Sequence, residues 1–227
     1  MNSTPRKRFT KTLASIAGLA LLAVPLAACG SDDESSDGGS SSSARPEPIA
    51  SITDLSTDKG TTAVKLDGAT LEALGGLGVE PTPFGTATIE DGSIIFPITG
   101  GNVTVFEKDA VPRYVVGQVQ HEGSGLSLTA GGVTVTVGNF NVDPTVSLVY
   151  GDVAVDGKVA ATSIPILRLD GRTLKTPTFD NGEAVLSGSG VFLTDGAATL
   201  LNDTFGVDAL SGSTKIGVAT ITANIPA

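Results

Sequence analysis

The sequence predicts a mainly β domain, in which antiparallel strands form a sandwich or a barrel-like sheet together with two short helices. Val, Ile and Thr alternate with polar residues at a period of two from residue 49 onward, most clearly in residues 133–137. Pairs such as Asp91-Gly92 and Asn181-Gly182 separate the extended runs and suit two-residue hairpin turns, because both positions accept a positive φ at little cost. Two segments depart from this pattern and have the features of short helices.

Extended segments follow one another closely along this domain. We expect strands at residues 86–89, 93–97, 103–107, 114–119, 126–129 and 133–137. Asp156-Gly157 and Asp170-Gly171 predict further turns between strands. Residues 96–101, Phe-Pro-Ile-Thr-Gly-Gly, predict an edge or a strand end at Pro97 and a tight reversal or close backbone approach at the glycines. We interpret this segment as a hairpin turn, with a ligand-facing loop as the alternative.

The two helical segments are similar to each other. Residues 67–74 begin with Asp-Gly-Ala and stop at two glycines, and residues 195–202 begin with the same three residues and end near Gly206. An aspartate is a good N-cap, and glycine commonly ends a helix. The strands expected after them also align, at 84–89 and 216–221. The sequence therefore predicts a strand–helix–strand unit that occurs twice, with its helices as caps on the open ends of one β core.

The first 28 residues have the layout of a signal peptide for export. Basic residues at positions 6–11 precede an apolar run that is shorter than the roughly 20 residues of a membrane span. Leu26-Ala27-Ala28-Cys29 then resembles the lipobox of bacterial lipoproteins. This resemblance implies signal cleavage between Ala28 and Cys29 and lipidation of Cys29, with acyl chains such as palmitate. We therefore expect a protein held by its lipid anchor on the extracytoplasmic face of the cell membrane.

Composition divides the rest of the chain into a tether and a domain. Residues 29–48 comprise the cysteine and a Ser/Asp-rich stretch that we expect to be disordered, and residues 49–227 are long enough for a single β-rich domain. Cys29 is the only cysteine, so no disulfide can form within one chain. Removal of the signal leaves 10 basic and 24 acidic residues, a formal charge of −14. This charge argues against nucleic acid as a partner.

The sequence contains no recognisable catalytic or metal-binding constellation. His121 is the only histidine, and it stands where one expected strand turns into the next. Ser124 lacks the Gly-x-Ser-x-Gly pattern of a nucleophile elbow, and the acids of the turns lack the spacing of a calcium loop. We interpret His121 as a turn residue bonded to its neighbours, with a general base as the alternative. Arg113, Arg168 and Arg172 are able to bind an anion, but their spacing does not bring them together.

Residues 117–144 carry a resemblance to a known family. The segments 117–123, Leu126-Ser127-Leu128 and 139–144 resemble parts of the HtaA-type haem-binding domains found on envelope proteins of Gram-positive actinobacteria. The resemblance implies a β-rich haem receptor in which a tyrosine ligates the iron and a histidine supports it. Only His121 matches by position. The segment that carries the family's tyrosine is missing, and Tyr114 and Tyr150 lie in other contexts.

Three functions follow from these features. The leading hypothesis is a non-enzymatic, lipid-anchored envelope module that binds a ligand or a protein partner through an apolar pocket or patch. The second is an HtaA-like accessory lipoprotein for haem uptake, with His121, Tyr114 and Tyr150 as candidate ligand-binding residues. The third is a hydrolase that uses His121. The sequence leaves the ligand, the partner and the oligomeric state open.

Overall fold

The computed structural model describes residues 46–57 and 60–225, which belong to a compact unit spanning residues 44–227. The predicted signal peptide, Cys29 and most of the tether lie outside the described residues. Within the described part of the chain, no helix is both long and apolar enough to cross a membrane.

The described residues form a mainly β structure with two α-helices and one short 3-10 helix. The helices are α1 (Gly68–Gly76), α2 (Asp195–Phe205) and the 3-10 helix η1 (Gly171–Thr173). The strands are β1 (Pro48–Ile52), β2 (Thr61–Leu66), β3 (Glu80–Gly85), β4 (Thr88–Glu90), β5 (Ser93–Pro97), β6 (Gly100–Phe106), β7 (Val115–Ala130), β8 (Val133–Asp143), β9 (Leu148–Val155), β10 (Lys158–Asp170), β11 (Thr178–Asp180), β12 (Glu183–Leu193) and β13 (Lys215–Asn224).

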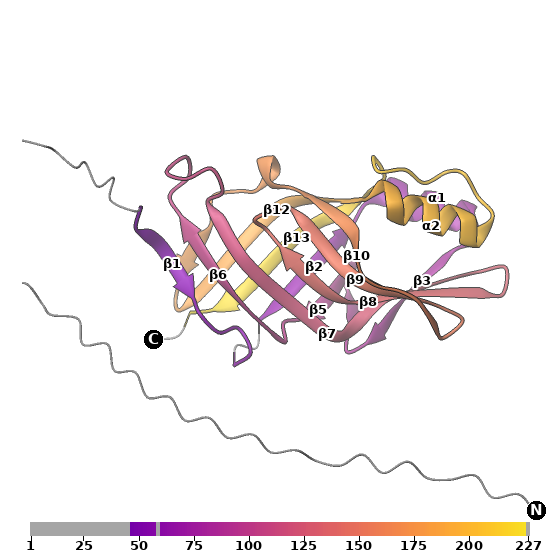
Figure 1. The fold of residues 1–227 in the computed structure, drawn as a ribbon, viewed down its shortest axis with the longest axis horizontal. Helices are drawn as coiled ribbons and strands as arrows, with labels where there is room; N and C mark the ends of the chain where they lie inside the picture. The colour runs from indigo at the N-terminus through magenta and orange to yellow at the C-terminus, as the bar shows by residue number, and fades with distance from the viewer. Residues whose placement is uncertain (1–45, 58–59, 226–227) are drawn as a thin grey trace, which may run out of the picture. The chain divides into compact units, whose positions relative to one another are not determined.

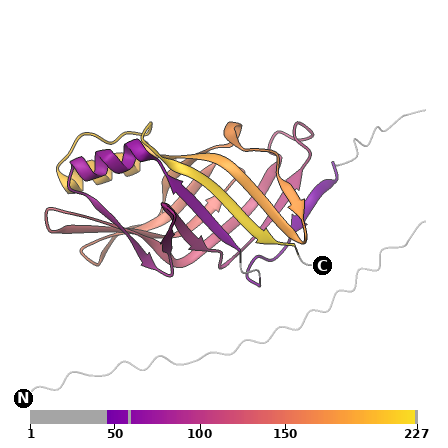
Figure 2. The same ribbon diagram turned by 180° about the vertical axis from the view of Figure 1, so that it is seen from behind.

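These strands form one antiparallel sheet in the order β1-β6-β7-β8-β9-β10-β12-β13-β2-β5-β4. β3 pairs with the distal half of β7, and β11 pairs with β12. The sheet curls on itself into a half-barrel (Figures 1 and 2). The predicted mainly β, antiparallel fold class is confirmed, and the barrel-like alternative describes it better than a sandwich.

Backbone hydrogen bonds bring β5 close to β7, although these strands are far apart in the sheet order. Thr99 N–H donates to Gln120 O at 2.8 Å, just after β5 ends at Pro97. The chain then continues into β6, which pairs with β7 rather than with β5. We expected a hairpin turn at residues 96–101, but these residues form a junction between two strands. The strand end at Pro97 and the close backbone approach at Gly101 are both confirmed.

The concave face of the curled sheet carries the main hydrophobic core. The period-two pattern places alternate side chains of each strand on this face. Val64 of β2, Phe96 of β5, and Val135 and Phe140 of β8 are among its buried residues. The Phe96 and Phe140 rings meet edge to face, with centroids 5.4 Å apart. This core lies between residues 52 and 223, so the domain contains its own core without the first 43 residues.

Two expected strands and two expected turns differ from the structure. Residues 114–119 and 126–129 belong to one long strand, β7, whose register shifts between His121 and Gly125. His121 therefore lies within a strand and is not a turn residue. The turns at Asp91-Gly92, Asp156-Gly157 and Asn181-Gly182 have positive φ at both residues and are confirmed. Asp170-Gly171 instead leads into the 3-10 helix η1, because the Asp170 carboxylate accepts the Arg172 N–H.

Both predicted helices form, but the repeat around them is only local. α1 and α2 lie at the same end of the sheet (Figures 1 and 2), not one at each end. β12 and β13 pair with each other on either side of α2, whereas β2 and β3 on either side of α1 do not pair. The expected strand at 84–89 is also divided, since β3 ends at Gly85 and β4 begins at Thr88.

Candidate ligand-binding cavity

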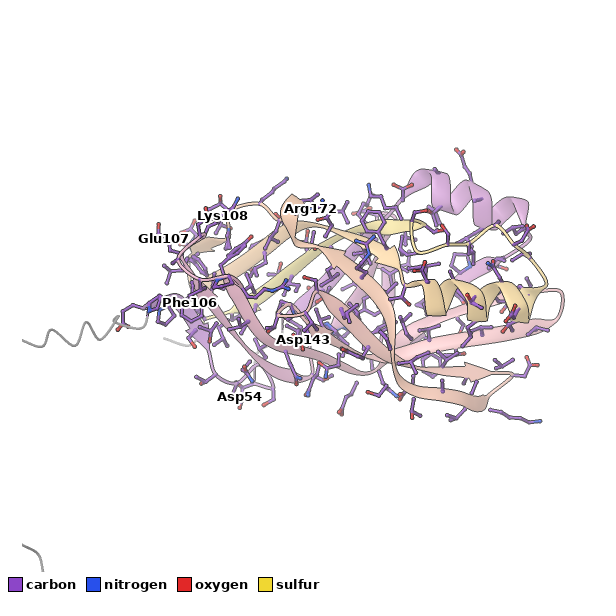
Figure 3. All side chains as sticks on the ribbon, turned by 45° about the horizontal axis from the view of Figure 1, so that its top comes forward. Asp54, Phe106, Glu107, Lys108, Asp143 and Arg172 are labelled. Carbon is purple, nitrogen blue, oxygen red and sulfur yellow. The ribbon has the colours of Figure 1, made fainter. Side chains whose placement is uncertain are left out.

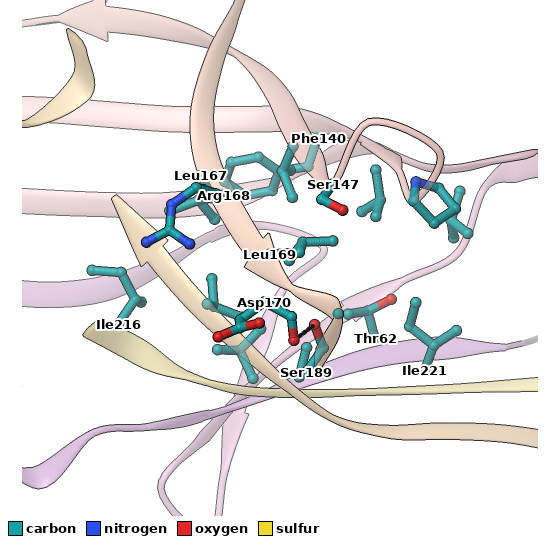
Figure 4. A pocket seen from close by; sticks show the side chains of 18 of the residues that line it. Thr62, Phe140, Ser147, Leu167, Arg168, Leu169, Asp170, Ser189, Ile216 and Ile221 are labelled. Carbon is teal, nitrogen blue, oxygen red and sulfur yellow. Dashed lines mark hydrogen bonds between the residues drawn. The ribbon is translucent and has the colours of Figure 1, made fainter. Parts of the chain in front are cut away.

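The curl of the sheet encloses a largely apolar cavity of about 790 Å³ that opens to solvent. Aliphatic and aromatic side chains from most strands line it, among them Val64, Phe96, Leu126, Val137, Leu169 and Ile221. Figure 4 shows Leu167 and Leu169 of β10 and Ile216 and Ile221 of β13 around this space. Its volume lies within the range of about 300–1,000 Å³ that is usual for small-molecule sites.

The cavity extends as far as the two helices. Leu71 and Leu74 of α1 and Leu201 and Phe205 of α2 are among its lining residues. α2 is firmly held, because Thr194 caps its first turn and Ala197, Ala198 and Leu201 are buried. α1 has no buried residue, and the side chain of its N-cap, Asp67, does not cap its first turn but pairs with Lys215, whose backbone oxygen accepts a hydrogen bond from Thr70. α1 is therefore the less firmly held of the two helices, and we call it the loose cover of the cavity.

His121 is the main buried polar group on the cavity wall. Its side chain is 1% exposed, its Nδ1 lies 3.0 Å from Pro97 O, and its Nε2 lies 3.1 Å from Thr62 Oγ1. Because a carbonyl oxygen only accepts, Nδ1 carries the proton in the neutral ring. The lone pair of Nε2 then accepts the hydrogen of the Thr62 hydroxyl. Both ring nitrogens are satisfied by groups on β2 and β5.

This environment makes His121 a structural group rather than a base. Burial lowers the pKa of His121 below its ordinary value of 6.5, and the hydrogen bond to Pro97 offsets only part of that shift. Ser124 Oγ donates to the backbone carbonyl of His121 and does not contact the imidazole. Within residues 46–57 and 60–225, the hydrogen-bond partners of the ring are Thr62 and Pro97. The arrangement lacks the nucleophile–base–orienter sequence of a hydrolase.

Basic residues are among those that line the cavity, and we call the part of its wall formed by Lys108, Arg113, Arg168, Asp170 and Arg172 the mouth. Figure 3 shows Lys108 at the end of the sheet opposite the helices and Arg172 on the next loop. The fold thus places the arginines that the sequence spacing left apart on the wall of one cavity.

The two loops that carry Lys108, Arg113 and Arg172 share an apolar base. Tyr114, which follows Arg113, and Leu174, which follows η1, both pack against the small cluster of Val105, Val115 and Leu186.

The cations of the mouth differ in how they are paired. Arg172 donates to both carboxylate oxygens of Asp170, at 2.9 and 2.8 Å, and holds the pKa of that carboxyl at about 2. The Arg168 guanidinium lies 4.7 Å from the centroid of the Phe192 ring. Among the described residues, Lys108 and Arg113 make neither an ion pair nor a side-chain hydrogen bond. These two cations are therefore available to a ligand.

The two tyrosines have different positions. Tyr114 lines the cavity, and burial, helped by the negative charge of Asp109, raises the pKa of its phenol. Tyr150 lies on β9 opposite Asn141 and is not among the lining residues. Tyr114 lies seven residues before His121, and seven residues of extended chain span about 23 Å. The two side chains therefore cannot bind one metal ion together, and the described residues contain no metal-binding group of three acids, histidines or cysteines.

Sequence reasoning missed Thr62 and Lys108. Thr62 occupies an inward position in Thr-Thr-Ala-Val-Lys-Leu, where the period-two pattern marks it as a polar residue on an otherwise apolar face. That signal was present in the sequence. Lys108 lies in the loop between β6 and β7, and no periodicity in the sequence relates this loop to η1.

Comparisons with known proteins identify the fold. No protein-family model and no curated protein matches the sequence. Among solved structures, the C-terminal domain of HtaA from Corynebacterium glutamicum is similar with a TM-score of 0.53 and 14% identity, over 77% of this chain and 98% of that domain. The N-terminal domain of HtaA has a TM-score of 0.45 and 13% identity, over 74% of this chain and 97% of that domain. The haem-binding protein HtaB of the same organism has a TM-score of 0.37 and 10% identity, over 77% of this chain and 96% of that protein chain. The predicted resemblance to HtaA-type domains is confirmed at the level of the fold.

Proposed function

We propose that the protein is a non-enzymatic binding module that holds an apolar small molecule inside the curled sheet, outside the cytoplasm and anchored through Cys29. The observation that carries this proposal is the open, apolar cavity of about 790 Å³. Transfer of apolar surface from water into such a space is favourable, and it needs no catalytic group. The buried His121, with both nitrogens engaged, fits a wall that is kept neutral.

A neutral fluorescent naphthylamine dye tests this proposal, with the chain from Gly30 to Ala227 as the protein. We expect saturable, one-to-one binding with a blue-shifted emission. Leu169→Trp fills part of the cavity and should weaken binding at least about ten-fold, since it removes apolar contact area and adds steric overlap. Val159→Trp is the matched control, because Val159 lies on the same strand and is 72% exposed. Absence of saturable binding, or equal affinities for the two variants, would contradict the proposal.

Haem is the second candidate ligand, and the similarity of fold to the HtaA domain favours it. Tyr114 and His121 both line the cavity, so each is a possible axial ligand on its own. Binding through His121 Nε2 would require the Thr62 hydrogen bond to break. The test is titration with haem. A Soret shift that Tyr114→Phe or His121→Ala abolishes would support haem binding, and an unchanged spectrum would exclude it.

A further inference from the structure

We infer that the ligand is an anionic amphiphile, whose charged head lies at Lys108 and Arg113 and whose acyl chain extends toward α1 and α2. This inference rests on the proposed function, because it assigns a chemical class to the molecule in the same cavity. It also commits to an orientation, with the head at the mouth and the chain inside.

The distribution of charge points to an anion. The chain is acidic overall, yet four of the eight basic residues in the described ranges line the cavity, against two of the nineteen acidic ones. The two acids are Asp109 and Asp170, and Asp170 is already paired with Arg172. Because most acidic side chains lie away from the lining of this apolar cavity, the lining is complementary to a ligand of negative charge.

The apolar part of the cavity is complementary to a chain. Besides the mouth, the lining includes Leu169, Phe96, and Leu71 and Leu74 of α1. Its buried polar side chains, Thr62 and His121, are bonded to each other. A ligand group inside therefore meets no unsatisfied donor on these two residues. A long, unbranched hydrocarbon chain satisfies this requirement without polar groups of its own.

The route of the chain places the mouth beside the start of the domain. β1 begins at Pro48, and Pro48 lies opposite Phe106 in the sheet, two residues before Lys108. Pro48 lies nineteen positions after Cys29 in the chain, a span of at most about 65 Å. Acyl chains on Cys29 would thus keep the mouth within that reach of a membrane, where anionic amphiphiles are available.

The test compares the fluorescent fatty acid cis-parinarate with its methyl ester on the chain from Gly30 to Ala227. We expect Lys108→Gln and Arg113→Gln each to weaken carboxylate binding about two- to five-fold and to leave ester binding unchanged. Lys158→Gln removes one charge from an exposed strand end that does not line the cavity, and it serves as the control. The comparison of both ligands on each variant cancels the different solubilities of acid and ester.

Each outcome has a distinct meaning. If both ligands bind and the mouth variants behave like Lys158→Gln with both, the head assignment is wrong and the proposed function stands. If neither ligand nor the neutral dye binds, the proposed function fails as well. Displacement of parinarate by a lysophosphatidic acid, but not by a lysophosphatidylcholine of equal chain length, extends the head chemistry from a carboxylate to a phosphate.

Discussion

Thr62 donates a hydrogen bond to His121 across the interior of the curled sheet, over 3.1 Å, although five strands separate β2 from β7 in the sheet order. The same imidazole donates to Pro97 at the end of β5. One buried side chain thus joins three strands at the place where the sheet approaches itself. His121 therefore links the strands that close the half-barrel, which explains why a single histidine lies in an apolar wall.

The variant Thr62→Val should destabilise the fold by about 1–3 kcal/mol, because it keeps the shape of the side chain but leaves the buried Nε2 without a donor. Urea unfolding followed by far-ultraviolet circular dichroism measures this change. Thr162→Val is the control, since Thr162 is exposed on β10, and it should change stability by less than about 0.5 kcal/mol. Equal effects of the two substitutions would contradict the proposed role of the Thr62 hydroxyl.

His121 should also make stability depend on pH. Its pKa in the folded protein is below 6.5, so the unfolded chain binds a proton that the folded protein does not. Stability is therefore full above pH 6.5 and falls as the pH decreases below that value. His121 is the only histidine, and other side chains ordinarily titrate outside this range. We expect the free energy of unfolding, measured by urea titration between neutral pH and about pH 5, to depend less steeply on pH in His121→Gln than in the parent protein. An unchanged slope would show that other groups cause the dependence.

Local chemistry made much of the fold predictable from the sequence. Asp91-Gly92 and Asn181-Gly182 adopt the expected positive φ, and α1 and α2 form where Asp-Gly-Ala begins a segment. Errors arose where tertiary contacts decide the outcome. β7 continues through His121 because β8 pairs with both of its halves across a bulge. No local pattern in the sequence predicts that pairing of strands.

The candidate site was predictable only in its parts. His121 was identified from its uniqueness, but the sequence does not reveal its burial, which depends on β2 and β5 closing over it. Arg113 and Arg172 were identified as anion-binding types, but the sequence does not show that the loops that carry them share an apolar base, which involves Tyr114 and Leu174. Long-range packing of this kind has no periodicity along the chain.

Gly101→Ala should destabilise the protein by about 3 kcal/mol or more. Gly101 has φ of 113°, and a Cβ there would lie 2.1 Å from the backbone oxygen of Gln118 on the paired strand. The backbone of the paired strand cannot move aside at low cost within a sheet, so the strain of the positive φ and the steric overlap of the added Cβ both destabilise the variant. Gly196→Ala is the control, because that glycine lies in α2 with open space around it and should gain about 0.5–1 kcal/mol in helix propensity. Thermal unfolding distinguishes the two, and similar melting temperatures would contradict the close approach of β6 and β7.

Asp170→Asn should strengthen the binding of an anionic amphiphile. Asp170 is the bidentate partner of Arg172, whose side chain is 88% exposed at the mouth. The asparagine oxygen still accepts the Arg172 backbone N–H, so η1 should keep its start, while the guanidinium loses its counter-charge. Parinarate affinity should rise about two- to five-fold and the affinity of the ester should not change. A gain in affinity for both ligands would indicate an effect on the cavity rather than on charge.

α1 should open far more often than α2, and a ligand should suppress that opening. α2 has a Thr194 cap, three buried residues and a left-handed Gly206 at its end, whereas α1 has no buried residue and no side-chain cap. A cap and a few buried side chains amount to about 2–3 kcal/mol, so amide hydrogen exchange in α1 should be at least about 30-fold faster. Because Leu71 and Leu74 line the cavity, parinarate should slow exchange in α1 and leave α2 nearly unchanged. Equal protection of both helices without ligand would contradict the assignment of α1 as the loose cover. Protection of α2 alone on binding would place the acyl chain elsewhere.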